Sequence, residues 1–382
     1  MSRRRVLLGA MLLDLAVSPL FAWDVFTASL QRDLGAGPTA LTSVFSVGLA
    51  AFTTGVLVGG RIADSIAPRR MALVAAVGTV AGLLGSAAAA SVLVMVLAFG
   101  IVLGGTTGLG YATAVRVAGT FTTGRGLALG LVVSAYAIGT AILAPVAAAL
   151  LDGLGRSWTF VLLAAVLGIL LVVAAVLLPA EAATAPTVET GHDDRRTPRG
   201  QVAALWLAFG LGSAPALAAF ARAGPLAGST AAAAAAVTLL NVGNFVGRLV
   251  AGPASDRWGR RATLHANSAL LVVACIPLAA GVDGPPALVA LFLLGTQYGA
   301  LSTLTPAAVS DVVPTQRFGA VYGRVFSGWG IAGLLAPVVA SAIAAVTGFG
   351  IVYAGFIVVA AVSWLCVALY ARSARDGRAP TR

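Results

Sequence analysis

The sequence predicts an all-α integral membrane protein whose twelve membrane-spanning helices form two pseudo-symmetric six-helix bundles. Three observations lead to this fold class. Hydrophobic residues occupy 59% of the 382 positions and charged residues only 10%, whereas a soluble domain carries about 25% charged residues. Apolar stretches of roughly 20 residues, enough to cross about 30 Å of hydrocarbon, recur along the whole chain. Several landmarks also repeat at one fixed offset.

The offset indicates that the chain contains two copies of one unit. Gly60 and Gly252 lie 192 positions apart, and so do Asp64 and Asp256. The same offset separates Arg125 from Arg317 and Pro145 from Pro337. A duplicated multi-span membrane protein is the usual architecture of a secondary transporter.

The predicted spans divide into two sets of six. The first set lies at 6–30, 39–60, 71–90, 92–121, 126–151 and 157–179. The second set lies at 202–222, 229–254, 263–281, 286–312, 319–346 and 349–371. Residues 181–200 are the long polar stretch between them. We therefore expect an N-terminal bundle over 1–180, a cytoplasmic linker over 181–200 and a C-terminal bundle over 201–382.

Arginine, which supplies all 24 basic residues, is concentrated in the loops on one side of the spans. The other side receives only Arg32, Arg156 and Arg222. Cytoplasmic loops are enriched in basic residues, so we expect a multi-pass protein of the cytoplasmic (inner) membrane with both termini in the cytoplasm. The net charge of +11 thus reflects topology, and we expect the lipid bilayer rather than nucleic acid as the partner. Because Asp14 interrupts the first apolar run, we do not expect this segment to be a cleaved signal peptide.

The sequence does not favour an enzyme. Cys275 and Cys366 lie within apolar stretches, and the two histidines are His192 in the linker and His265 at a helix start. This composition provides no metal cluster or nucleophile constellation. We therefore expect neither catalytic residues nor a cofactor, and a monomeric protein.

A polar stripe on the eighth span is the strongest candidate binding site. An ionisable group at the bilayer centre costs about 2.5–3.5 kcal/mol, which makes Arg248 a functional candidate. Asn241, Asn244 and Arg248 share one helical face at spacing i, i+3, i+7. A guanidinium can hold a carboxylate through two parallel hydrogen bonds. The alternative is a structural arginine paired with a buried acid.

Other spans contribute further candidates for substrate binding. Tyr111 and Arg116 on the fourth span point about 140° apart, so both cannot face one cavity squarely. Arg116 either joins the site or extends to the cytoplasmic interface. Gln297 on the tenth span and Trp329 on the eleventh complete the set.

Two acids on the first span, Asp14 and Asp24, are candidates for proton coupling. They lie about 15 Å apart along a helix and roughly 80° apart around it. Desolvation favours the protonated form of a carboxyl group, which would allow either acid to carry a proton. Either acid could equally be the fixed partner of an arginine.

The repeated loops are candidates for a cytoplasmic gate. An acid at the end of the second or eighth span can pair with the positive N-terminal end of the eleventh or fifth helix. The candidate gate residues are Asp64, Arg69, Arg70, Arg125, Asp256, Arg260, Arg261 and Arg317. A purely topogenic loop would explain the arginines but not the paired acids.

The two loops resemble the signature cytoplasmic loop of the major facilitator superfamily, and this resemblance extends over the whole chain. It implies that superfamily's fold of two six-helix bundles. The first copy departs from the pattern, because Ser65 stands where a basic residue is common and Ala67-Pro68 replaces the usual glycine.

A narrower resemblance is to the oxalate/formate antiporter and monocarboxylate transporter branch. The segments 19–26, 108–111 and 121–130 are similar to motifs of that branch. Arg248 falls where the branch carries its carboxylate-binding arginine. Asn244 replaces the acid of proton-coupled relatives, and Trp329 stands near the second cation of the oxalate exchangers. A single fixed cation favours a monocarboxylate, unless Arg116 serves as the second.

We therefore expect a secondary active transporter of a small organic anion that works by alternating access, as proton symport or anion exchange. The alternative is a proton-coupled drug or amphiphile exporter of the same superfamily. Arg248 on a polar stripe counts against that alternative. A receptor that binds without transport would be expected to carry a sizeable soluble extension, and no loop here is long enough.

Overall fold

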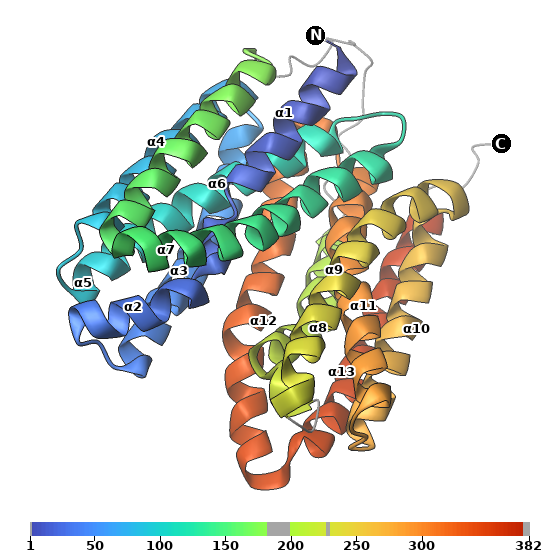
Figure 1. Ribbon diagram of the computed structural model, residues 1–382. Coiled ribbons are helices and arrows are strands. Elements are labelled where there is room, and N and C mark those ends of the chain that lie inside the picture. The colour runs from blue at the N-terminus through green and yellow to red at the C-terminus, as the bar shows by residue number, and fades with distance from the viewer. Residues whose placement is uncertain (1, 182–198, 227–229, 377–382) are drawn as a thin grey trace. The chain divides into compact units, whose positions relative to one another are not determined.

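The computed structural model describes residues 2–181, 199–226 and 230–376, with the side chains at 221–234 and 373–376 outside that description. Every regular element in these ranges is helical, and they contain no strand (Figure 1). This confirms the predicted all-α class. The predicted linker, residues 181–200, lies almost entirely outside the described residues.

The chain divides into two compact units that each include a short segment from the other sequence half. Unit 1 comprises Met1–Thr120, Val132–Val188 and Thr315–Gly323, and unit 2 comprises Phe121–Leu131, Glu189–Pro314 and Arg324–Arg382. The segment 121–131 contains Arg125, and the segment 315–323 contains Arg317. The two exchanged segments therefore occupy equivalent places in the sequence repeat.

The first predicted span is not one continuous helix. It consists of α1 (Arg3–Ala16), a 3-10 turn η1 (Pro19–Ala22) and α2 (Asp24–Leu34). Pro19 accounts for the break, because proline lacks a backbone N–H and its ring clashes with the preceding helical turn. The residues before and after Pro19 are apolar, so the hydrophobic pattern alone predicts a single helix.

The remaining helices of the first sequence half follow the predicted order. They are α3 (Pro38–Ala63), α4 (Pro68–Ala87), α5 (Val92–Met95), the π-helical segment η2 (Val96–Leu103), α6 (Gly104–Gly119) and α7 (Arg125–Leu177). The segments α5, η2 and α6 together form the fourth span. α3 packs along η2 and α6, and α4 covers the same pair.

α7 contains two predicted spans. Gly155 interrupts its helical geometry with φ 72° and ψ 175°, a conformation that essentially only glycine adopts. Among the described residues, eleven helices are long and apolar enough to cross a membrane. Because α7 counts as two of these crossings, the predicted number of twelve agrees with the structure.

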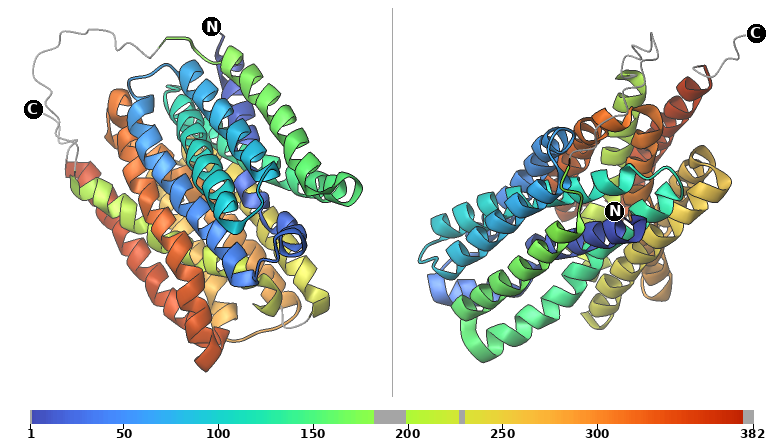
Figure 2. Two further views of the ribbon diagram at one scale, coloured as in Figure 1. Left: turned by 90° about the vertical axis from the view of Figure 1, so that its left-hand side faces the viewer. Right: turned by 90° about the horizontal axis from the view of Figure 1, so that it is seen from above.

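The second sequence half supplies α8 (Arg199–Leu226), α9 (Thr230–Trp258), α10 (Arg260–Ala279), α11 (Pro285–Val312), η3 (Thr315–Arg317), α12 (Phe318–Thr347) and α13 (Phe349–Asp376). In unit 2, α9 packs along α11 and α8 along α13, while α10 contacts α11 and α13 (Figure 2). The helices run side by side, as expected for a membrane-spanning bundle.

Glycine allows α9 and α11 to touch through their backbones. A Cβ atom added to Gly299 would collide with the carbonyl of Asn244, and one on Gly295 would collide with that of Leu240. Gly243 and Gly247 approach α11 in the same way. Within a bilayer the hydrophobic effect does not drive helices together, so their association depends on close packing. Small residues at such spacing permit that packing. This contact fixes the position of the α9 segment that carries Arg248.

We expect Gly299→Ala to push α9 away from α11 and to destabilise the protein by about 1–3 kcal/mol, the usual cost of overpacking. The measurement is the melting temperature of the purified protein in detergent. Gly355→Ala is the matched control, because open space surrounds that position on α13. Equal melting temperatures for the two variants would contradict the close α9–α11 contact.

Candidate functional site

The carboxylate of Asp64 caps the start of α12 within unit 1. Asp64 lies just after the end of α3, and its Oδ1 accepts a hydrogen bond of 3.0 Å from the backbone N–H of Gly319. Its Oδ2 accepts one of 2.8 Å from the N–H of Ala320. A helix N-terminus carries unsatisfied N–H groups and partial positive charge, so it binds a carboxylate well. We call this arrangement, together with Arg116, the first cap.

Arg116 on α6 completes the first cap. Its Nε donates a 2.9 Å hydrogen bond to Asp64 Oδ1, and the two side chains are only 4% and 10% exposed. The Asp64 carboxylate thus receives one guanidinium and two amide donors in a place that water barely reaches. Arg116, a candidate for substrate binding, is placed by the structure against Asp64.

Aromatic side chains surround the first cap. Phe318 at the start of α12 stacks on Tyr322 at 5.8 Å, and its ring fills the space above Gly119 on α6. The hydroxyl groups of Tyr322 and Tyr111 lie 3.2 Å apart in a buried contact. Tyr111 is therefore also near the first turns of α12.

The carboxylate of Asp256 caps the start of α7 within unit 2. Asp256 belongs to the last turn of α9, and its Oδ1 accepts a 3.0 Å hydrogen bond from the N–H of Gly126. Its Oδ2 accepts a 3.1 Å hydrogen bond from the N–H of Leu127. Together with the neighbouring charged groups described next, this forms the second cap.

Asp311 on α11 links two arginines in the second cap. Arg260 Nε donates to Asp311 at 3.2 Å, and its Nη2 lies 3.7 Å from Asp256 Oδ1. Arg125 Nη1 donates to Asp311 at 3.2 Å and to the Ser310 hydroxyl at 3.1 Å. These side chains are 12–36% exposed, so the second cap is wetter than the first.

The sequence reasoning did not select Asp311. Its equivalent in the first half is Gly119, so the repeat gave no reason to single it out. The available signal was an acid at the end of the tenth span.

The other arginines of the repeated loops are placed differently. Arg69 donates to the carbonyls of Ala175 and Val176 at 3.2 and 3.3 Å, at the C-terminal end of α7. A helix C-terminus carries partial negative charge, so a cation there is stabilising. Arg70 and Arg317 are exposed, and Arg261 is half-buried.

Arg248 is buried in unit 2, with 8% exposure. Its Nε donates a 2.9 Å hydrogen bond to Oδ1 of Asn244, one turn earlier on α9. Its backbone carbonyl accepts from the hydroxyl of Thr303 on α11 at 3.2 Å, and Gly130 of α7 packs directly against that carbonyl. Both the backbone and one edge of the guanidinium are therefore held in place.

Aromatic residues lie near Arg248. Tyr298 on α11 is within electrostatic range of the guanidinium and accepts a 2.8 Å hydrogen bond from Nε1 of Trp329 on α12. The ring of Phe220 lies edge-on to Tyr298 at 5.6 Å. Tyr298 was not among the sequence candidates, although it directly follows Gln297, which was.

Asn241 and Gln297 have other surroundings. Asn241 is exposed, and its amide donates to the Val237 carbonyl of its own helix at 2.9 Å. Gln297 is buried and lies beside Gly212 of α8, and its Oε1 accepts no hydrogen bond from the described residues. On α11, Gln297 and Tyr298 point about 100° apart. The structure thus groups Asn244, Arg248, Tyr298 and Trp329, with Asn241 and Gln297 directed elsewhere.

An aromatic cluster forms the middle of unit 1. Phe21 of η1, Phe52 of α3, Tyr111 of α6 and Tyr136 of α7 meet at centroid distances of 5.6–6.0 Å, mostly edge to face. Such contacts add about 0.5–1.5 kcal/mol per pair beyond the burial of area. Four helices are therefore tied together near the break in the first span.

The two candidate proton carriers differ in environment. Asp14 on α1 is completely buried, whereas Asp24 is exposed and is the first residue of α2. A helix N-terminus stabilises the ionised form of a carboxylate. Burial instead penalises a charged carboxylate.

Comparisons with known proteins agree with this architecture. A family profile described as Major Facilitator Superfamily matches residues 6–227 and 202–382. The uncharacterized MFS-type transporter YhjX of Escherichia coli (strain K12) is 24% identical over 350 residues, which cover 86% of this chain and 85% of that protein.

Solved transporter structures share the fold at low sequence identity. The human organic anion transporter MFSD10 (TETRAN) is 16% identical, with a TM-score of 0.73 and coverage of 96% of this chain and 100% of that one. The proton:xylose symporter XylE has a TM-score of 0.70 at 16% identity, covering 95% of each chain. FucP in the outward conformation has a TM-score of 0.73 at 14% identity, covering 99% of each.

The twelve apolar crossings, the repeated loops with their capping acids and the two matched profile regions lead to one conclusion. The protein is an integral membrane transporter and not an enzyme, and it belongs to the Major Facilitator Superfamily.

Proposed function

We propose that this protein is a secondary active transporter of small monocarboxylates, placed in the cytoplasmic membrane with both termini in the cytoplasm. The observation that carries the proposal is the buried Arg248, whose guanidinium is oriented by Asn244. A bidentate pair between a fixed guanidinium and a carboxylate gives both affinity and geometric selection. In this proposal the guanidinium of Arg248 binds the carboxylate of the substrate.

The number of cations supports a monocarboxylate over a dicarboxylate. Arg116 is bound to Asp64, so it serves the first cap in this proposal rather than the substrate. Tyr298 OH, which lies within electrostatic range of Arg248, is bonded to Trp329 Nε1. One guanidinium with aromatic residues beside it suits a small substrate that carries a single carboxylate. MFSD10, named an organic anion transporter, shows that this fold serves anion transport in another protein.

The two caps support an alternating-access cycle. Each cap joins helices from different halves of the sequence: α3 and α6 with α12, and α9 and α11 with α7. We propose that the caps hold the cytoplasmic gate closed and break when the protein opens inward. Asp64 and Asp256 are the central residues of this gate.

Asp14 is the better candidate for a coupling proton. A carboxylate with no solvent exposure in a membrane helix requires either a proton or a compensating charge, and both change during a transport cycle. Asp24 is exposed to water, so its carboxylate does not meet this requirement. A drug exporter would also use a buried acid. Replacing Arg248 would leave the transport activity of such an exporter unchanged, which distinguishes the two functions.

The first prediction concerns Arg248. In liposomes containing the purified protein, we expect uptake of labelled lactate or a related small monocarboxylate, lowered about tenfold or more in Arg248→Ala. Arg248→Lys keeps the charge but loses the planar fork, and should recover little of the uptake. Arg257→Ala, on the exposed end of the same helix, is the matched control. Full carboxylate uptake by folded Arg248→Ala would refute the proposal.

The second prediction concerns coupling. With Asp14→Asn, we expect an inward proton gradient to stop accelerating uptake, while exchange against internal unlabelled substrate continues. Asp24→Asn should keep the acceleration. The measurement compares initial uptake rates with and without the gradient in parallel liposome preparations. Acceleration that survives in Asp14→Asn and vanishes in Asp24→Asn would reverse the assignment.

The third prediction concerns the caps. Both Asp64→Asn and Asp256→Asn should lower the melting temperature, because each leaves helix N–H donors without an anion. Asp64→Asn also removes the carboxylate that pairs with Arg116. The Asp256 effect should shrink between about 0.01 M and about 1 M salt, where the screening length falls from about 30 to about 3 Å. The drier Asp64 pair should respond less.

Asp283→Asn is the control for this comparison, because Asp283 is exposed and lies outside both caps. An equal salt response of the Asp64 and Asp256 variants would mean that their different exposure has no energetic consequence.

A further inference from the structure

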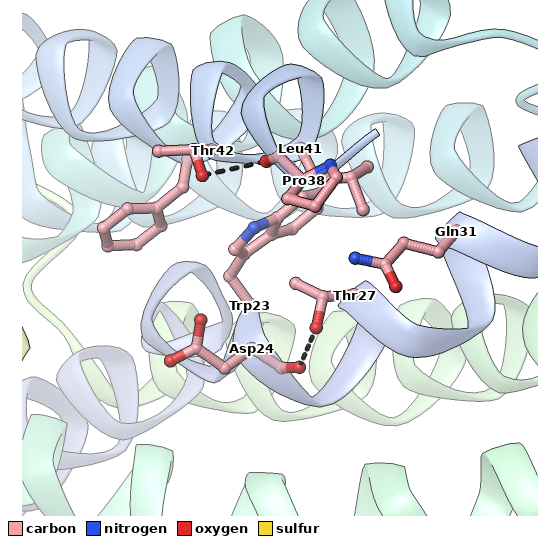
Figure 3. A pocket seen from close by; sticks show the side chains of 8 residues that line it. Trp23, Asp24, Thr27, Gln31, Pro38, Leu41 and Thr42 are labelled. Atoms are coloured by element: carbon pink, nitrogen blue, oxygen red, sulfur yellow. Dashed lines mark hydrogen bonds between the residues drawn. The ribbon is translucent and has the colours of Figure 1, made fainter. Parts of the chain in front are cut away.

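We propose that unit 1 carries a second binding site, separate from Arg248, which takes a small organic ammonium ion. The site is a cavity of about 260 Å³ formed where α2 turns back into α3. Trp23 is one of the residues that line it, and its charged group is the carboxylate of Asp24 (Figure 3). The assignment does not depend on the transported substrate.

A short, rigid connection builds this cavity. α2 ends at Gly35, whose φ of 61° is a left-handed conformation suited to glycine, and α3 begins at Pro38 only three residues later. Asp24, Thr27 and Gln31 fall at i, i+3 and i+7, so α2 presents one face to the cavity. The two walls are therefore held together by local chain geometry.

The charge of the cavity is negative. None of the eight described residues that line it is basic, and Asp24 is its single ionisable group. The Asp24 carboxylate forms no ion pair with any described residue. A solvent-accessible carboxylate beside an apolar wall attracts a cation.

The remaining polar groups favour an ammonium ion over a metal ion. The hydroxyls of Thr27 and Thr42 donate to the carbonyls of Asp24 and Pro38 in their own helices. In Figure 3 the Asp24 carboxylate and the Gln31 amide lie apart, with the Thr27 side chain between them. Oxygen ligands thus do not converge on one point, as a hydrated hard cation requires.

Besides the carboxylate, the aromatic side chains of the cavity would also contribute to binding the ammonium ion. A cation placed over an indole face is attracted by the ring quadrupole, and quaternary ammonium ions are bound in this way. Trp23 reaches the cavity with the 3% of its surface that is exposed, and it is packed on Phe99 at 4.7 Å, so its ring is fixed before a ligand arrives. Phe45 adds a second aromatic wall from α3. The cavity therefore fits an ion of the size of tetramethylammonium or choline.

The test measures binding rather than transport, so it stands apart from the proposed function. Purified full-length protein is titrated with tetramethylammonium chloride, and melting temperature and tryptophan fluorescence are followed against sodium chloride at equal ionic strength. We expect a saturable change with tetramethylammonium that sodium does not produce. Asp24→Asn should weaken it about tenfold or more, as expected when a charged contact is lost.

Matched variants make the outcome specific. Asp152→Asn removes another exposed acid, in α7 and outside the cavity, and should bind normally. Trp23→Phe retains a ring with a weaker quadrupole, so it should bind more weakly while remaining folded. A response that survives Asp24→Asn, or the lack of a tetramethylammonium-specific response in the unaltered protein, would overturn the proposal. An equal response to sodium that Asp24→Asn abolishes would also overturn it, in favour of an inorganic cation site.

Discussion

Capping of helix N-termini by distant carboxylates is the interaction on which the arrangement of this chain depends. Asp64 binds the first amides of α12, and Asp256 binds the first amides of α7. In both cases the acid and the capped helix come from different halves of the sequence. This is why residues 121–131 and 315–323 belong to compact units other than those of their sequence neighbours. A helix start that would otherwise lack partners for its N–H groups is satisfied by an acid far along the chain.

The repeat gives two similar caps with different chemistry around them. In the first, one guanidinium approaches from α6 and the side chains are almost dry. In the second, Asp311 adds a further acid, and two arginines share the carboxylates in partly solvated surroundings. Charge pairs gain strength as water is excluded, but breaking a dry pair also costs more. Opening the cytoplasmic side, in the proposed cycle, therefore meets two unequal barriers.

Backbone contact between helices places the proposed substrate arginine. Gly299 lets α11 approach the backbone of Asn244, and Gly130 lets α7 approach the carbonyl of Arg248. Thr303 then bonds the same carbonyl. The side chain is held through Asn244, so little conformational freedom is left to lose when an anion binds. In the proposed function, the arginine that binds the anion is thus positioned by residues that carry no charge.

The sequence by itself determined the helical class, the number of crossings and the acids of the repeated loops. These features follow from local rules: apolar length, the 192-residue offset and the rarity of charge in membrane spans. It also selected Arg248 with Asn244, because the two lie on one polar helical face together with Asn241. The break at Pro19 and the π-helical segment at Val96–Leu103 were not evident, since apolar periodicity continues through both.

Only the tertiary structure decided which groups meet. Three contacts join residues 31 to 52 positions apart: Arg116 with Asp64, Arg260 with Asp311, and Trp329 with Tyr298. No periodicity links such positions, because their proximity is set by how helices pack. The same limit applies to Asp14 and Asp24, whose spacing in the sequence is plain but whose opposite exposure depends on neighbouring helices. The local sequence pattern specifies on which helical face a residue lies. Helix packing specifies which residues of other helices contact that face.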